Sequence, residues 1–142
     1  MSKQCDYVVV GAGSAGCAVA ARLCEAGANV ALIEAGTKAN QSAVKIPASY
    51  FPLMDSEIDW GYRTIPQREL NNRRMFISRG RGLGGTCLMN ALVYMRGNRG
   101  DYDRWCDLGS AGWGYDDVLP LFRRSEHNES FGEPFHGKAR SL

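Results

Sequence analysis

The hydrophobic positions near the start of the chain follow first a strand pattern and then a helix pattern. The run from Asp6 to Val10 is mostly apolar and β-branched and stops at Gly11, which is typical of a strand buried in a parallel sheet. Small and apolar residues then recur at helical spacing from Ser14 to Glu25. A second apolar run, residues 29–34, ends in an acid. The pattern predicts one βαβ unit over residues 1–36 and therefore an α/β fold.

Beyond residue 36 the hydrophobic pattern becomes irregular. Prolines and aromatic residues are spread over polar sequence, which predicts an extended excursion rather than regular elements. A glycine-rich block at residues 80–85 opens a segment, 86–94, for which a short helix is expected. Residues 101–108 and 116–124 each have the spacing of a short amphipathic helix.

Composition narrows the choice of partners. A chain of 142 residues with 44% hydrophobic residues has the size and apolar content of one globular domain. A net charge of +2 is too small to indicate a nucleic-acid partner. No stretch resembles a secretion signal or the roughly 20 apolar residues of a membrane-spanning helix. We therefore expect a cytoplasmic location and leave peripheral contact with the inner membrane open.

Cysteine usage indicates neither a disulfide framework nor a zinc site. The chain has five cysteines, an odd number, and none of them forms a C-x-x-C pair. We expect reduced thiols and no bound metal.

The clearest chemical motif lies at the turn between the first strand and the helix. Residues 11–16 read G-x-G-x-x-G, and Glu34 follows at the end of the next strand. Such a turn lets the backbone approach a pyrophosphate, which the free N–H groups at the helix start would bind, while the acid would accept hydrogen bonds from ribose hydroxyls. The candidate contacts are Gly11, Gly13, Ser14, Ala15, Gly16, Glu34 and Ala35. The motif predicts a Rossmann-like FAD or NAD(P) site; the acid disfavours NADP, and an ordinary glycine turn remains the alternative.

A second glycine-rich block carries a family resemblance. The sequence from Gly80 to Gly97, GRGLGGTCLMNALVYMRG, resembles the first signature of the glucose-methanol-choline (GMC) oxidoreductases. Cys87 departs from that signature, because the family usually has a small hydroxyl residue or glycine there. The resemblance continues through the residues 59–62 (DWGY) and 113–115 (WGY), and it is strongest to choline dehydrogenase-like alcohol dehydrogenases.

The resemblance implies FAD as the cofactor and assigns roles to both glycine blocks. The first would hold the ADP half, and a flavin-proximal segment, residues 78–108, would lie along the isoalloxazine. Further candidate contacts are Trp60, Gly84, Gly85, Thr86, Asn90, Ala91, Leu92 and Val93. Some members attach FAD through a histidine just before the asparagine; Met89 occupies that position here, which implies non-covalent FAD.

The resemblance also implies that residues 1–142 are the amino-terminal part of an FAD-binding domain, without a substrate domain. The family fold would then be incomplete, and unpaired strand edges and apolar surface would be exposed. The family's catalytic histidine lies near the carboxyl end of a far longer chain, so no catalytic residue is assigned. His127 and His136 are interpreted as surface or structural residues.

The resemblance implies oxidation of an alcohol or choline-like substrate to an aldehyde by hydride transfer to flavin, with a quinone or oxygen as electron acceptor. Three alternatives stay open: an NAD-dependent dehydrogenase module, a non-catalytic nucleotide-binding remnant or interaction module, and a lyase that keeps FAD without using its redox chemistry.

Overall fold

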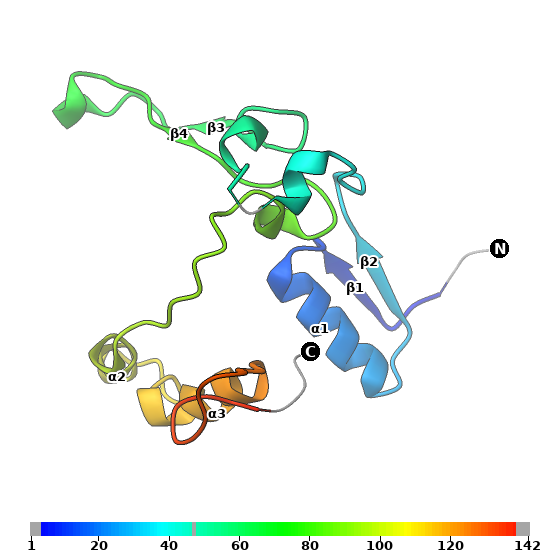
Figure 1. Cartoon of the computed structure of the whole chain (residues 1–142), viewed down its shortest axis with the longest axis vertical. Helices are drawn as coiled ribbons and strands as arrows, with labels where there is room; N and C mark the ends of the chain where they lie inside the picture. Colours follow the sequence, from blue (N-terminus) through cyan, green and yellow to red (C-terminus); the bar gives the residue numbers. More distant parts are fainter. Residues whose placement is uncertain (1–3, 47, 139–142) are drawn as a thin grey trace. The chain divides into compact units, whose positions relative to one another are not determined.

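The computed structural model describes residues 4–46 and 48–138. The chain divides into two compact units, and it passes from the first to the second between Val93 and Tyr94. Figure 1 traces both units in the colours of the sequence. Each unit is described by itself below.

The first unit begins with the predicted βαβ arrangement. Strand β1 (Tyr7–Val10) leads into helix α1 (Ser14–Glu25), and strand β2 (Val30–Ile33) follows. The two strands are parallel, with Tyr7 opposite Val30 and Val10 opposite Ile33. In Figure 1 the helix runs alongside the strand pair. The α/β prediction is confirmed, and α1 has the bounds that its apolar periodicity predicts.

The two strands are more exposed than their composition predicts. Val8 is 56% exposed and Val10 is 81% exposed. The expectation of a strand buried on both faces is therefore wrong for the described residues, because this sheet has two strands there and α1 packs against it. The exposure agrees with the expectation that an incomplete sheet leaves apolar surface open.

The excursion after β2 contains short 3₁₀ helices and one small hairpin. The 3₁₀ helices span Ser42–Lys45, Phe51–Leu53 and Arg68–Leu70. Strands β3 (Tyr62–Arg63) and β4 (Phe76–Ile77) pair antiparallel. Leu53, Ile58 and Met89 are buried together as the core of this region.

The segment after the second glycine block is not the helix that the sequence predicts. A 3₁₀ helix spans Gly85–Leu88, and no helix or strand is found from there to residue 98. Asn90 explains part of the difference, since its side-chain Oδ1 accepts a hydrogen bond from the backbone N–H of Leu92 at 2.9 Å. A local bond of this kind competes with helical hydrogen bonding.

The second unit contains the two remaining helices, α2 (Arg99–Asp107) and α3 (Tyr115–Arg124). Both agree with the predicted helices to within two residues. The start of α2 is capped by Asn98, whose Oδ1 accepts a hydrogen bond from Gly100 N–H at 3.0 Å. Asp103 of α2 accepts a hydrogen bond from Tyr115 N–H at 2.9 Å and so ties the start of α3 to α2. Within the described ranges, no helix is long and apolar enough to cross a membrane.

Candidate functional site

The turn between β1 and α1 is built around the close approach of backbone atoms. Gly11 has φ of +98°, in the left-handed region that favours glycine. A Cβ at Gly16 would lie 1.8 Å from the carbonyl oxygen of Gly11, so a side chain there would displace backbone. The glycines of the motif therefore allow the first turn of α1 to pack directly on its entry loop.

The start of α1 offers unpaired donors. Gly13 is the N-cap and contributes no side-chain cap. The first N–H groups of an α-helix have no partner within the helix, and the helix dipole favours negative charge at that end. Ser14, Ala15 and Gly16 belong to this first turn and line a pocket. The arrangement is suited to a phosphate or pyrophosphate.

Glu34 ties the end of β2 to the same turn. Its Oε2 accepts a hydrogen bond from Ala12 N–H at 2.7 Å, and its Oε1 accepts one from Gly36 N–H at 2.9 Å. These bonds, first from Gly36 and then from Ala12, hold the pKa of the Glu34 carboxyl below its usual value. The carboxylate is therefore ionised at neutral pH. Each oxygen keeps a second lone pair, so hydroxyl groups of a ligand can still bind.

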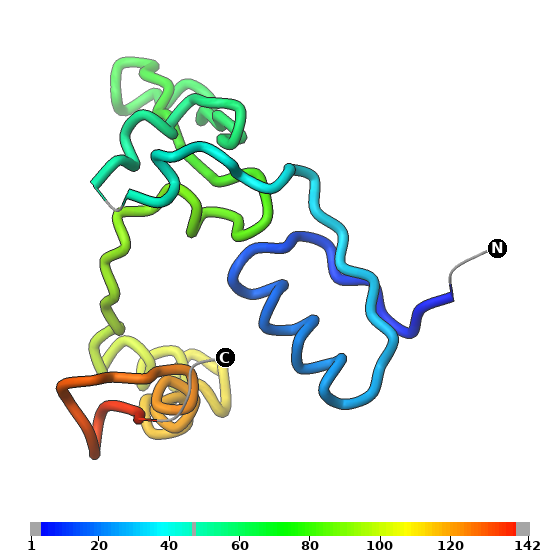
Figure 2. Tube along the Cα trace, turned by 45° about the vertical axis from the view of Figure 1, so that its right-hand side comes forward, coloured from blue at the N-terminus to red at the C-terminus, as the bar shows by residue number. Residues whose placement is uncertain are grey.

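The second glycine block returns to this turn from about 70 residues further along the chain. Gly84 N–H donates to the carbonyl oxygen of Ala12 at 2.8 Å. Gly85 approaches Gly13 so closely that a Cβ on Gly85 would lie 2.9 Å from the Gly13 Cα. Figure 2 shows the yellow-green stretch before residue 90 lying beside the blue turn that enters α1. The two motifs that the sequence identified separately thus form one site.

A pocket of about 600 Å³ opens between the two blocks. That volume is within the usual range for small-molecule and cofactor sites. Its lining includes the candidate residues Gly11, Gly13, Ser14, Ala15, Gly16, Glu34, Ala35, Trp60, Gly85 and Thr86, together with Val10, Ile33 and Gly80. Gly84 supports the pocket through its bond to Ala12. Asn90, Ala91, Leu92 and Val93 are not among the lining residues, and their contact with a flavin stays a prediction.

Cys87, the residue that departs from the family signature, lies beside the start of α1. Its Sγ is 2.9 Å from the hydroxyl oxygen of Ser14. The structure thus brings the thiol to the first residue of α1, 73 positions away in the sequence.

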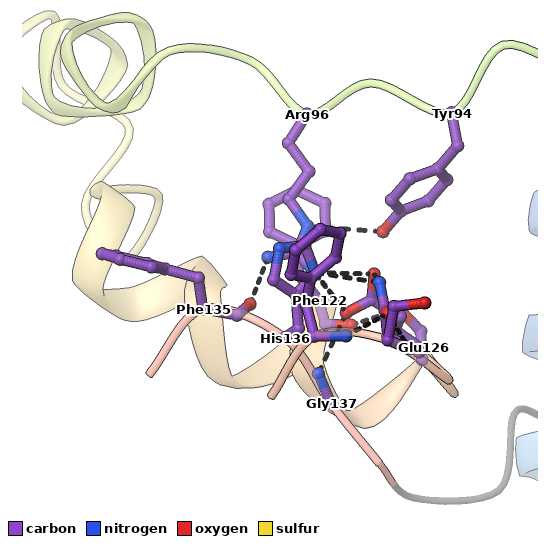
Figure 3. A network of polar contacts seen from close by, with 11 residues as sticks. Tyr94, Arg96, Phe122, Glu126, Phe135, His136 and Gly137 are labelled. Atoms are coloured by element: carbon purple, nitrogen blue, oxygen red, sulfur yellow. Dashed lines mark hydrogen bonds and ion pairs between the residues drawn. The ribbon is translucent and has the colours of Figure 1, made fainter. Parts of the chain in front are cut away.

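The second unit contains a dense polar network that the sequence did not reveal (Figure 3). Arg96 donates from Nη2 to Glu126 Oε2 at 2.8 Å, and the two side chains are only 12% and 11% exposed. Glu126 also accepts a hydrogen bond from Gly137 N–H at 2.9 Å, and His136 Nδ1 lies 3.1 Å from its Oε1. The guanidinium of Arg96 stands 5.2 Å from the ring centroid of Phe122.

This network places His136 beside a largely buried carboxylate, and its interpretation as a surface or structural residue stays a prediction. The hydrogen bond from Gly137, followed by those from His136 and Asn128, lowers the pKa of Glu126 to about 2, against the opposing effect of burial. The ionised Glu126 carboxylate thus holds the segment after α3 in place through its contacts with His136 and Gly137. His127 Nδ1 lies 3.2 Å from the Lys138 carbonyl oxygen.

Comparisons with known proteins agree with this geometry. The model of the GMC oxidoreductase family matches residues 5–138. An oxygen-dependent choline dehydrogenase of Rhizobium johnstonii is 43% identical over 136 residues, which are 94% of this chain and 25% of that protein.

Solved structures show the same likeness. Pyridoxine 4-oxidase from Mesorbium loti superposes with a TM-score of 0.89 and 40% identity, covering 95% of this chain and 27% of that one. An FAD-dependent oxidoreductase from Chaetomium thermophilum gives a TM-score of 0.82 and 30% identity, over 96% of this chain and 25% of that one. The chain thus spans about a quarter of the length of these proteins.

Proposed function

Because the chain belongs to the GMC oxidoreductase family, we propose that it binds and orients FAD as the amino-terminal part of an enzyme that oxidises alcohols. In this proposal the first unit holds the ADP half of the cofactor. The intact enzyme converts an alcohol or choline-like substrate to an aldehyde. The oxygen-dependent choline dehydrogenase and the pyridoxine 4-oxidase among the similar proteins support that class of reaction.

The single observation that carries the proposal is the meeting of both glycine blocks with Glu34 around one pocket. The pyrophosphate would sit on the N–H groups at the start of α1, and the ribose hydroxyls would donate to the Glu34 carboxylate. The residues fit such a group, since a Cβ at Gly16 or Gly85 would push backbone out of place.

The cofactor, when bound, supplies the redox chemistry by accepting a hydride from the alcohol carbon. The residues of this chain bind the cofactor and orient it. Their glycines keep side chains out of the space that the pyrophosphate would occupy. Asn90 to Val93 would approach the isoalloxazine. The electron acceptor would be a quinone or oxygen, and a quinone acceptor would bring an otherwise cytoplasmic enzyme to the inner membrane surface.

Non-covalent attachment of FAD is part of the proposal. Met89 is 4% exposed and packs with Leu53 and Ile58. A thioether in an apolar core offers no nucleophile for a covalent link to the flavin. This packing supports reversible binding of the cofactor.

The second candidate function is a nucleotide-binding module without turnover. It is favoured by the surroundings of His136, which lies against Glu126 in the polar network of the second unit. A histidine engaged in this way helps to hold the segment after α3 in place. Binding of FAD without its reduction by an alcohol would support this candidate for the 142-residue chain.

Titration of the purified chain with FAD, ADP and NAD tests the proposal. Flavin fluorescence and calorimetry should give saturable binding of FAD and ADP and weaker binding of NAD. Glu34→Gln should weaken FAD binding by roughly tenfold or more, because one amide of the turn would face an NH₂ group instead of an acceptor. Glu25→Gln, an exposed carboxylate of α1 paired with Arg22, is the matched control and should bind as the unchanged chain does. Equal affinities of the two variants, or tighter binding of NAD than of FAD, would contradict the proposal.

A further inference from the structure

Asp59 stands out from the other charged residues because its carboxylate is buried. The residue is 8% exposed, and no other charged or polar residue is as buried in the described part of the chain. Each of its oxygens accepts two hydrogen bonds. Oδ1 receives the N–H groups of Gly61 and Arg79 at 2.9 and 3.0 Å, and Oδ2 receives Asp55 N–H at 3.0 Å and Ser78 Oγ–H at 2.7 Å.

These four bonds join two segments that are separate in the sequence. Two of the donors, Asp55 and Gly61, belong to the turn around Asp59, and the other two, Ser78 and Arg79, follow β4. The backbones of the two segments are paired as well. Trp60 N–H donates to Arg79 O at 2.9 Å, and Asp59 forms an antiparallel bridge with Gly80. The carboxylate therefore holds together a short antiparallel ladder, in which Asp59 and Trp60 pair with Arg79 and Gly80.

The ladder forms one wall of the nucleotide pocket. Trp60 and Gly80, which flank the locked residues, both line the pocket. The guanidinium of Arg81 lies 5.1 Å from the Trp60 ring centroid, and the Tyr62 ring stacks on Trp60 at 5.9 Å. The Arg81 backbone passes so close to Gly36 that a Cβ on Gly36 would lie 2.5 Å from the Arg81 carbonyl. This wall therefore stands at the β2 end of the pocket, beside Glu34.

We propose that Asp59 is a positioning residue whose buried carboxylate holds the indole of Trp60 against the adenosine half of the bound cofactor. The proposal rests on FAD binding at this pocket, as proposed above. The carboxylate acts through the ladder and does not itself reach the pocket, because the neighbouring amides occupy both of its oxygens. Since Trp60 is 43% exposed, its ring has a free part to offer a ligand.

The test follows the emission of Trp60 in the full chain. The chain has three tryptophans, so Trp105→Phe and Trp113→Phe leave Trp60 as the only indole. Asp59→Asn keeps the shape of the side chain and turns one acceptor into a donor. In either orientation of the amide, at least one backbone N–H of Asp55, Gly61 or Arg79 then faces an N–H group.

We expect Asp59→Asn to weaken the binding of ADP and of FAD alike by roughly tenfold. We also expect bound FAD to quench Trp60 emission less at saturation than in the unchanged chain. The saturated value is the decisive reading, because a merely structural role would lower affinity without moving the indole in the complex. Asp55→Asn makes the same chemical change in the same turn, at an exposed side chain paired with Arg63, and should alter neither reading.

Two results would overturn the proposal while FAD binding by the unchanged chain stands. One is an Asp59→Asn variant with the affinity and quenching of Asp55→Asn; the other is a weaker affinity with unchanged saturated quenching. If the unchanged chain binds neither ADP nor FAD, the proposed function itself fails and takes this inference with it. Should Asp59→Asn not fold, Ser78→Ala removes one of the four bonds and should produce the same two changes at roughly threefold in affinity; an unaltered Ser78→Ala would then overturn the proposal.

Discussion

Gly16 illustrates how one residue without a side chain makes a binding site possible. The atom that a Cβ would meet, the Gly11 carbonyl oxygen at 1.8 Å, belongs to the backbone and cannot rotate away. We predict that Gly16→Ala lowers the free energy of unfolding of the first unit by about 1 to 3 kcal/mol, the usual cost of overpacking. Because the turn must shift, FAD binding should fall below detection in the same titration.

Gly100 provides the control for this substitution. It also lies in a helix, α2, but the nearest atom that its Cβ would meet is Asn98 Oδ1 at 3.7 Å. Gly100→Ala should therefore leave FAD binding unchanged and should stabilise the chain by up to about 1 kcal/mol, since alanine favours helix. Similar losses in the two variants would show that the close contact at Gly16 is not what matters.

At the residue scale, the sequence singled out glycines that line one pocket in the structure, but it indicated only part of the contacts of Glu34. Its place after an apolar run predicts an acid at the end of a strand, close to a ribose. Its bond to Ala12, which is 22 positions away, depends on how the strand ends and the turn come together in space. No spacing rule could predict that the same carboxylate also accepts a hydrogen bond from the turn between β1 and α1.

At the element scale, the quality of each prediction followed the strength of its local signal. Helix α1 combines apolar periodicity with a glycine just after its end, and its bounds were predicted correctly. The segment 86–94 is apolar without a clear helical stripe. There the side chain of Asn90 bonds locally and Leu92 takes φ of +54°, so the helix does not form. Tertiary contacts and side-chain competition decided this case.

The segment after α3 is the element whose stability should depend on pH. The hydrogen bonds to Glu126 lower its pKa from 4.5 to about 2. A carboxyl whose pKa is depressed by folding stabilises the folded state above its unfolded pKa and loses that contribution as the pH falls through the folded value. We predict that the denaturant midpoint of the second unit decreases as the pH is lowered from about 5 to about 2. Emission of Trp105 and Trp113 would follow the unfolding of this unit.

Glu126→Gln should remove most of this pH dependence and lower the midpoint at neutral pH, because Arg96 would be left buried without a counter-charge. Asp116→Asn is the comparison, since Asp116 pairs with Arg99 at the surface, where both side chains are more than half exposed. Exposed ion pairs contribute little to stability. An acid transition that survives in Glu126→Gln, or one that Asp116→Asn abolishes, would refute this assignment.

At the scale of the whole chain, the two units bury few large side chains, and none of those in the described ranges falls below 2% exposure. Exposed apolar side chains lie on both strands of the β1–β2 sheet, where Tyr7, Val8, Val10, Leu32 and Ile33 are between 41% and 81% exposed. Strand edges without a neighbour and exposed apolar side chains favour association. The sequence predicted this exposure because one βαβ unit cannot cover its own sheet.

We therefore predict that the 142-residue chain binds a hydrophobic dye and self-associates at micromolar concentration, as light scattering would detect. Val10→Lys places a charge at the end of β1, at the most exposed of these residues, and should reduce both signals, because a lysine at an edge opposes strand pairing. Leu108→Lys removes an equally large exposed side chain, 75% exposed and just past the end of α2, without touching that surface. If Leu108→Lys suppressed association as strongly as Val10→Lys, general solubility would be the cause. A selective effect of Val10→Lys would instead identify the open sheet as the surface through which the chains associate.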